Sequence, residues 1–87
     1  MFEWDEHNVG PIVAKHHVDP REAEEAVLDP DRAPFTAREG RTGFIGMTDD
    51  GRVLVVIVER RGRGAWRVVT ARDAGSKEKR AYRRHNR

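Results

Sequence analysis

The sequence predicts an α+β fold, in which two helices precede a mostly antiparallel sheet and a basic helix follows it. Three segments carry this prediction. Residues 51–72 have the pattern of a β-hairpin, residues 19–28 begin with helix-start signals, and residues 73–85 combine helix-forming residues with many cations. A chain of 87 residues suits one domain with a small core, so residues 1–87 are expected to fold as a single unit.

The hairpin is the strongest of these signals. Residues 53–58 are all apolar and five of the six are β-branched, which is typical of a strand that is covered on both faces. Two glycines in residues 61–64 favour a tight reversal, and β-forming residues resume from Ala65 to Ala71. Strict alternation would place Trp66, Val68, Thr70 and Arg72 on one face of the second strand.

The N-terminal part predicts a short strand and two helices. Residues 2–4 alternate apolar and polar side chains, and Asn8 is a plausible N-cap for a helix over about residues 9–17, with Pro11 in its first turn. Asp19, Pro20 and Glu22 form a clearer start, for a helix that runs through Leu28. The expected inward residues are Ile12, Val13 and His16 in the first helix, and Val18, Ala23, Ala26 and Val27 at the second.

The remaining elements follow from turn residues and composition. Residues 29–40 contain two prolines and predict an irregular connection, long enough to suggest a functional role. Residues 41–48 predict a strand, and residues 49–51 a turn into the hairpin. Asp73 or Ser76 would cap a final helix that ends near His85, packs through Ala74, Ala81 and Tyr82, and exposes its cations.

Charge is segregated along the chain. Residues 1–50 carry 5 basic and 12 acidic side chains, a net charge of −7, whereas residues 51–87 carry 12 basic and 3 acidic ones, a net charge of +9. The basic half favours a polyanionic partner, and 14 of the 17 basic residues are arginine, whose planar fork suits phosphate. The alternative is a solvated surface whose two halves pair with each other.

Several classes of function are disfavoured. The chain has no cysteine for a disulfide, a thiolate nucleophile or a cysteine zinc site. It has no apolar run long enough to span a membrane, no signal-peptide start and no phosphate-binding loop, so we expect a soluble, cytoplasmic protein without a cofactor. Adjacent His16 and His17 would point about 100° apart on a helix, which disfavours a metal site, and His16 also fits a helix-end residue that hydrogen-bonds carbonyls.

Specific residues across the chain resemble one known family. They are Phe2-Glu3-Trp4-Asp5, Lys15-His16 with Val18, Glu22-Ala23, the run Gly51 to Val56, the run Arg67 to Ala74, Glu78 and Tyr82. This pattern is similar to that of the BrnT-type toxins of type II toxin–antitoxin systems. The resemblance implies a RelE-like fold and a ribonuclease that cuts RNA to inhibit translation, held inactive by a ribbon-helix-helix antitoxin. Two positions differ from the family pattern: His17 replaces a usual glycine, and Ile12 or a neighbour stands where the family has an asparagine in the first helix.

The same resemblance supplies candidate site residues. It carries Lys15, His16, Arg72, Glu78 and Tyr82 over as catalytic candidates and Arg60 as a further site residue. The basic residues expected to bind RNA are Arg60, Arg67, Lys79, Arg80, Arg83 and Arg84. Metal-independent cleavage requires activation of the 2′-hydroxyl, stabilisation of the phosphorane and protonation of the leaving oxygen. Arginine suits the second role, and His16 or Lys15 one of the others; the alternative is a non-catalytic RNA-binding module of the same fold.

The two strand-end arginines are expected to act separately. Arg60 adjoins the predicted turn, whereas Arg72 lies at the far end of the return strand, roughly 25 Å away at about 3.3 Å per residue. Because one phosphate cannot contact both, we assign Arg72 to the chemical step and Arg60 to RNA binding further along.

Overall fold

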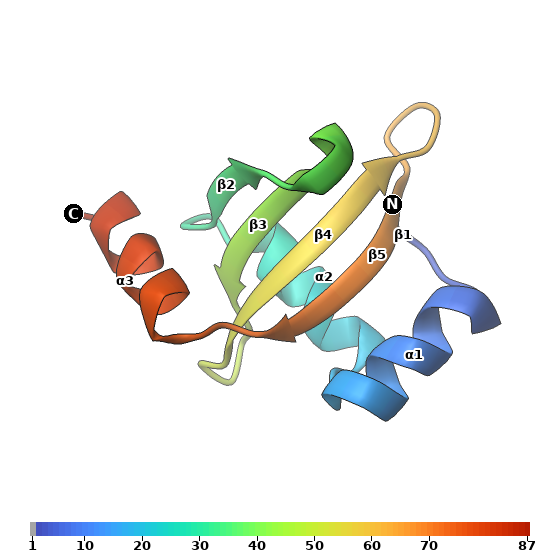
Figure 1. Cartoon of the computed structure of the whole chain (residues 1–87), viewed down its shortest axis with the longest axis horizontal. Helices are drawn as coiled ribbons and strands as arrows, with labels where there is room; N and C mark the ends of the chain where they lie inside the picture. Colours follow the sequence, from blue (N-terminus) through green and yellow to red (C-terminus); the bar gives the residue numbers. More distant parts are fainter. Residues whose placement is uncertain (1) are drawn as a thin grey trace.

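The computed structural model describes residues 2–87 and combines a five-stranded sheet with three α-helices (Figure 1). The strand order is β1-β5-β4-β3-β2; β1 pairs with β5 in parallel and the other neighbours are antiparallel. No helix within residues 2–87 is long and apolar enough to cross a membrane. The α+β class and the mostly antiparallel sheet expected from the sequence are therefore confirmed. The elements in chain order are β1 Phe2–Glu3, α1 Glu6–His16, α2 Pro20–Leu28, β2 Ala33–Thr36, the 3-10 helix η1 Arg38–Gly40, β3 Thr42–Met47, β4 Val53–Arg60, β5 Trp66–Asp73 and α3 Ser76–His85.

The predicted hairpin is formed by β4 and β5. The Arg61 N–H donates to the Ala65 carbonyl at 2.8 Å, and Gly62 and Gly64 supply φ angles of 63° and 65° in the turn. Such positive φ angles are easily adopted by glycine and costly for most other residues. The turn therefore forms where the two glycines predict it.

A β-bulge corrects the predicted alternation along β5. Ile57 pairs with Thr70 but the next residue, Val58, pairs with Val68, so Val69 is an extra residue in β5. An extra residue reverses the side-chain alternation beyond it. Val68 therefore packs in the core beneath the helices, whereas Arg72 lies on the opposite face beside Val55.

Helix α1 begins earlier than the sequence predicts. Asp5 is the N-cap: its carboxylate accepts from the His7 and Asn8 N–H groups, while the Asn8 Oδ1 accepts from the Asp5 N–H at 2.8 Å. Asn8 was expected as the cap but lies inside the helix, where this reciprocal capping box uses it. Pro11 consequently lies in the second helical turn, not the first, and the buried side chains of α1 are Asn8 and Ile12 rather than Val13.

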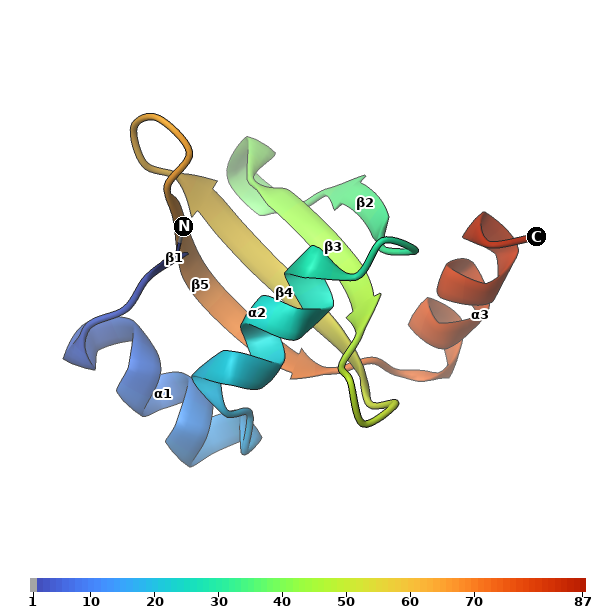
Figure 2. The same cartoon turned by 180° about the vertical axis from the view of Figure 1, so that it is seen from behind.

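Helices α1 and α2 cover one face of the sheet (Figure 2). Asp19 caps α2 and Pro20 opens it, as expected, and the predicted stripe of Val18, Ala23, Ala26 and Val27 is buried. Gly46 of β3 permits the close approach of α2, because a Cβ at this position would overlap the Ala26 carbonyl oxygen. The stripe from Val18 to Val27 packs in the larger core, together with Leu54, Val56, Val58, Val68 and Ala71 of the sheet.

The segment predicted as an irregular connection contains an edge strand and a short helix. Strand β2 pairs antiparallel with β3, and its Pro34 is tolerated because an edge strand has one unpaired side. Phe35 pairs with Gly43 and its ring lies against this glycine. The irregular prediction was wrong because antiparallel pairing with the next strand, β3, organises these residues.

Helix α3 packs on the second face of the sheet, at one end only. Its buried Tyr82 joins Ala33, Ile45, Val55 and Ala74 in a smaller core. The helix ends at His85 as predicted, but its N-cap is Gly75 rather than Asp73 or Ser76, and the Gly75 N–H donates to the Glu78 carboxylate at 2.8 Å. The rest of this face is left uncovered by the helices.

Candidate active site

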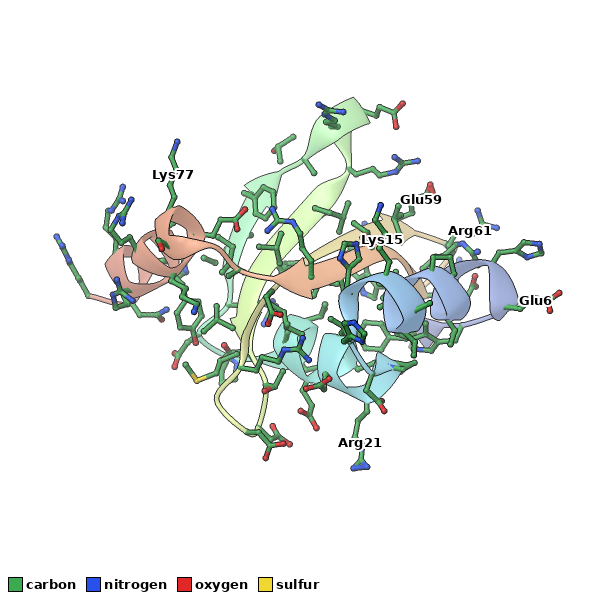
Figure 3. All side chains as sticks on the ribbon, turned by 60° about the horizontal axis from the view of Figure 1, so that its bottom comes forward. Glu6, Lys15, Arg21, Glu59, Arg61 and Lys77 are labelled. Atoms are coloured by element: carbon green, nitrogen blue, oxygen red, sulfur yellow. The ribbon has the colours of Figure 1, made fainter. Side chains whose placement is uncertain are left out.

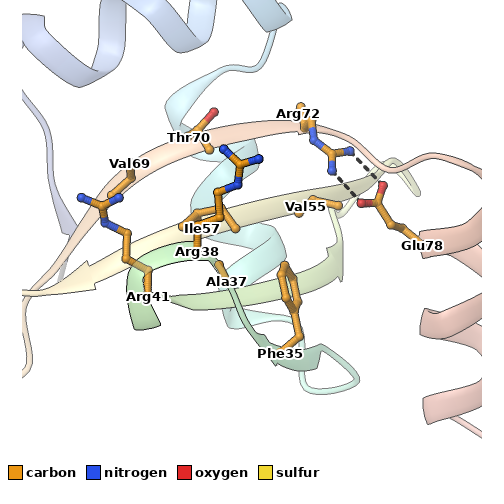
Figure 4. A pocket seen from close by; sticks show the side chains of 10 residues that line it. All are labelled: Phe35, Ala37, Arg38, Arg41, Val55, Ile57, Val69, Thr70, Arg72 and Glu78. Carbon is orange, nitrogen blue, oxygen red and sulfur yellow. Dashed lines mark hydrogen bonds and ion pairs between the residues drawn. The ribbon is translucent and has the colours of Figure 1, made fainter.

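An open depression of about 370 Å³ lies on the second face, between β5, the η1 segment and the start of α3 (Figure 4). Its apolar floor is made by Val55, Ile57 and Val69. Around this floor lie an aromatic ring, three arginines, a carboxylate and two small side chains, from Phe35, Arg38, Arg41, Arg72, Glu78, Ala37 and Thr70. We call this site the arginine pocket.

Three guanidinium groups reach the arginine pocket from two separate parts of the chain. Arg38 and Arg41 come from η1 and the residue after it, and Arg72 comes from β5 beyond the bulge. Arg41 is paired with Glu39 at 2.6 Å and with Glu59 at 3.2 Å. The Arg38 guanidinium makes no hydrogen bond or ion pair with any of residues 2–87, so its donors are available to a ligand.

Arg72 and Glu78 form a bidentate ion pair across the pocket edge. The Arg72 Nη1 donates to Glu78 Oε1 at 2.8 Å and the Nη2 donates to Oε2 at 2.6 Å. The Arg72 hydrogen bonds lower the pKa of Glu78 to about 2, and the Gly75 N–H adds to this effect. The carboxylate therefore stays ionised, and it fixes both the first turn of α3 and the direction of the Arg72 fork.

Tyr82 is a member of the predicted catalytic set that the structure places elsewhere. Its hydroxyl donates to Asp29 Oδ2 at 2.6 Å, and it does not line the arginine pocket. Burial and this contact with Asp29 raise the pKa of Tyr82 to about 12. Tyr82 thus ties α3 to the end of α2, and its hydroxyl is held as a neutral donor.

Lys15 and His16 lie in the last turn of α1, outside the residues that line the arginine pocket. Lys15 projects from α1 (Figure 3). Arg52 connects this turn to the end of β5: its Nη1 donates to the His17 carbonyl at 3.0 Å, and its Nε donates to Asp73 at 2.7 Å. Asp73 adjoins Arg72, so the end of α1 and the Arg72 strand are held together at the β5 edge.

The predicted RNA-binding residues divide into three environments. The Arg60 guanidinium lies 5.3 Å from the centre of the Trp66 ring, in a cation–π contact. Arg67 is neutralised by Asp5, with contacts of 2.8 and 3.2 Å, and its hydrogen bonds lower the pKa of Asp5 to about 2. The others are exposed cations on α3 that form no ion pair within residues 2–87: Lys79, Arg80, Arg83 and Arg84.

The separation of Arg60 and Arg72 is smaller than expected. Arg60 pairs with Trp66 and Arg72 with Val55, so five residues of β4 separate them, roughly 17 Å at about 3.3 Å per residue. The turn uses more residues than the sequence suggested, and the bulge absorbs another. At this distance the two arginines are still too far apart to contact one phosphate together.

Sequence reasoning missed Arg38 and Arg41 as pocket residues. The available signal was the length of the 29–40 segment, which suggested a functional role without naming a residue. Their position depends on pairing of β2 with β3, which brings η1 over the sheet. No group of three histidine, aspartate or glutamate side chains in the described part of the chain is arranged to hold a metal ion.

Comparison with known proteins identifies a family for most of the chain. A family model described as the ribonuclease toxin BrnT of type II toxin–antitoxin systems matches residues 4–78. The crystal structure of the ribonuclease toxin BrnT from Brucella abortus is similar to this one, with a TM-score of 0.69 and 25% identity over 87% of this chain and 99% of that chain. Among curated proteins, no match to the chain was found.

Proposed function

The chain belongs to the BrnT family of ribonuclease toxins of type II toxin–antitoxin systems, and we propose that it cleaves RNA in the arginine pocket. The observation that supports this location is the convergence of Arg38, Arg41 and Arg72 around one open depression. A scissile phosphate gains negative charge as it approaches the phosphorane, so prearranged cations accelerate the reaction. The open face admits a single strand, on which the 2′-hydroxyl is free to attack.

In this proposal Arg72 contacts the reacting phosphate, and Glu78 positions the Arg72 guanidinium. The Nη1 and Nη2 groups of Arg72 stay bonded to the Glu78 carboxylate. This pairing restricts the rotamers of Arg72 and reduces the ordering of its side chain that RNA binding requires. Arg38, whose guanidinium has no partner within residues 2–87, supplies the second phosphate contact. Arg41 keeps its carboxylate partners, so it contributes to the electrostatic potential at the phosphate and does not bond to the phosphate directly.

Proton transfer requires groups other than these arginines. Glu78 has a pKa of about 2 because of Arg72, so it is a weak base at neutral pH. We assign proton transfer to Lys15 and His16. They belong to the last turn of α1, and Arg52 joins the His16 and His17 carbonyls at the end of this helix to Asp73, the residue after Arg72. This arrangement uses no metal ion, and cleavage is expected to persist in EDTA.

Cations outside the pocket would hold the flanking RNA. Arg60 ends β4 next to the hairpin turn, and the exposed cations lie on α3. The hairpin turn and α3 are at opposite ends of the sheet (Figure 1). Arg60→Ala should weaken RNA binding and reduce the slope of log affinity against log salt by about one unit, while leaving turnover at saturating RNA unchanged. Arg67 is expected to contribute less, because Asp5 already neutralises it.

A type II toxin is controlled by a cognate antitoxin. We propose an antitoxin of the ribbon-helix-helix class that covers the arginine pocket with an acidic segment, and we expect the toxin to act on RNA in the cytoplasm. A small open reading frame for such a protein should lie beside the gene. A gene without such a neighbour would contradict this partner.

The decisive experiment incubates the purified protein with end-labelled single-stranded RNA in EDTA. Wild-type protein should cleave it, and Arg72→Ala should abolish cleavage while the protein stays folded and binds RNA only modestly more weakly. Arg21→Ala is the matched control, since Arg21 is an exposed arginine on the opposite side, on α2, and its loss should change nothing (Figure 3). If the wild-type protein binds RNA without cleaving it, the protein is an RNA-binding module instead. One observation favours this alternative: no histidine or lysine is among the described residues that line the pocket.

A further inference from the structure

Phe35 is an exposed aromatic side chain beside the cations of the arginine pocket. It retains 37% of its surface exposed, although it lies on an ordered edge strand. Burying a phenylalanine is favourable by about 1.5–3 kcal/mol, so exposure of this ring has a cost. Gly43 on β3 lets the ring lie low, because a Cβ there would overlap the tip of the ring.

The surroundings of Phe35 match the two halves of a nucleotide. On one side lies the apolar floor of Val55 and Ile57, and around it lie the arginines assigned to phosphate contact (Figure 4). A volume of about 370 Å³ is small among ligand pockets, which typically hold about 300–1,000 Å³. It suits one unstacked nucleotide.

We propose that Phe35 is a stacking platform for one nucleobase next to the scissile phosphate, an inference that rests on the cleavage of RNA in this pocket. Proteins that read single strands commonly stack unpaired bases on aromatic rings, and stacking tolerates any base because each has a π face. The ring is held against Gly43, so little ordering is needed when the base binds. Stacking would position the attached ribose, and hence its 2′-hydroxyl, over Arg38 and Arg72.

A simpler role for the ring is to cover Gly43, where the sheet lacks a side chain. Aromatic residues compensate strand glycines in this way. Phe35→Leu separates the two roles, because leucine keeps an apolar cover over Gly43 but has no π face. Phe35→Trp keeps both properties.

The test measures binding to a cleavage-resistant probe, a single-stranded oligonucleotide of mixed sequence with 2′-O-methyl ribose. Phe35→Leu should bind it about 5- to 100-fold more weakly than wild type, and Phe35→Trp should bind at least as tightly as wild type. A second set of probes carries one abasic nucleotide at each position in turn. At one position the abasic nucleotide should weaken binding to the wild-type protein by about the same factor as the Phe35→Leu substitution does. It should not weaken binding to Phe35→Leu any further, because that variant has no ring for the missing base to stack on.

Thermal unfolding and cleavage separate this inference from the proposed function. Phe35→Leu should unfold within a few degrees of wild type. It should cleave unmodified RNA with a raised KM and a lowered kcat, because both the base contact and the position of the 2′-hydroxyl are lost. If the wild-type protein cleaves RNA and Arg72→Ala does not, but Phe35→Leu binds every probe as wild type does, the stacking role is wrong and the pocket assignment stands. If Phe35→Leu loses stability without any change in abasic discrimination, the ring only covers Gly43. A wild-type protein without cleavage would overturn the proposed function itself.

Discussion

Replacing Asn8 with aspartate should remove the support of the β-bulge that directs Arg72 into the pocket. Asn8 is 4% exposed, and its Nδ2 donates to the Val68 carbonyl at 3.0 Å and to the Glu3 carbonyl at 3.1 Å. Val68 directly precedes the extra residue of the bulge. Aspartate has the same shape and can still accept from the Asp5 N–H, but an ionised carboxylate has nothing to donate to the two carbonyls.

The expected loss is large because two effects add to each other. Each buried carbonyl without a donor costs about 1–3 kcal/mol, and the buried carboxylate lies against two acceptors. The acceptor half of the capping box is retained, so loss of the cap contributes little. We expect the free energy of unfolding to fall by about 3 kcal/mol at pH 7, which lowers the unfolding midpoint by roughly 10–20 °C in a domain of this size.

The assay is urea unfolding followed by tryptophan fluorescence at several pH values. Burial and the facing carbonyls raise the folded-state pKa of the introduced carboxyl above its ordinary value of about 3.9. The destabilisation relative to wild type should therefore be smallest below about pH 4, where the carboxyl is protonated and can donate, and should grow as the pH rises. RNA cleavage at a temperature where the variant is folded should also fall, because Arg72 loses its fixed direction.

Asn86→Asp is the matched control for this prediction. The Asn86 amide also donates to two carbonyls, those of Asp31 and Tyr82, each at 2.9 Å, but the residue is exposed at the end of α3. Water replaces the lost donors there, and we expect a cost of about 1 kcal/mol or less. Equal losses in the two variants, or a loss in Asn8→Asp that does not change with pH, would refute the argument that buried donation holds the bulge.

Two further predictions concern packing and a buried hydroxyl. Gly46→Ala should destabilise the protein by about 2–3 kcal/mol in urea unfolding, because the added Cβ overlaps the Ala26 carbonyl of α2. Gly10 in α1 has free space around it, so Gly10→Ala should stabilise the protein by about 0.5–1 kcal/mol. Equal effects of the two substitutions would contradict this packing. Tyr82→Phe should cost about 1.5 kcal/mol through loss of the bond to Asp29. The pKa of Tyr82 is raised to about 12, so this contribution is complete below about pH 10 and declines as the pH rises towards 12, and a difference between the two proteins that stays constant across that range would count against it.

The sequence alone determined the elements whose signals are local. Helix α2 was predicted with its cap and first residue because Asp19 and Pro20 act on their own turn. The hairpin was predicted because a β-branched apolar run and two glycines are sufficient to specify strands and a reversal. The family, and Arg72 and Glu78 as candidate site residues, followed from residues that resemble the BrnT pattern. Their ion pair was seen only in the structure.

Tertiary structure decided the features that depend on how two segments of the chain pair or pack against each other. The start of α1 was misplaced because the local capping box between Asp5 and Asn8 was overlooked. The inward direction of the Asn8 amide, however, depends on the Val68 carbonyl, 60 residues away. Strand β2 exists through pairing with β3, and that pairing brings Arg38 to the arginine pocket. The face of Arg72 was set by a bulge that strand alternation cannot reveal, because register is a property of two paired strands and not of either one.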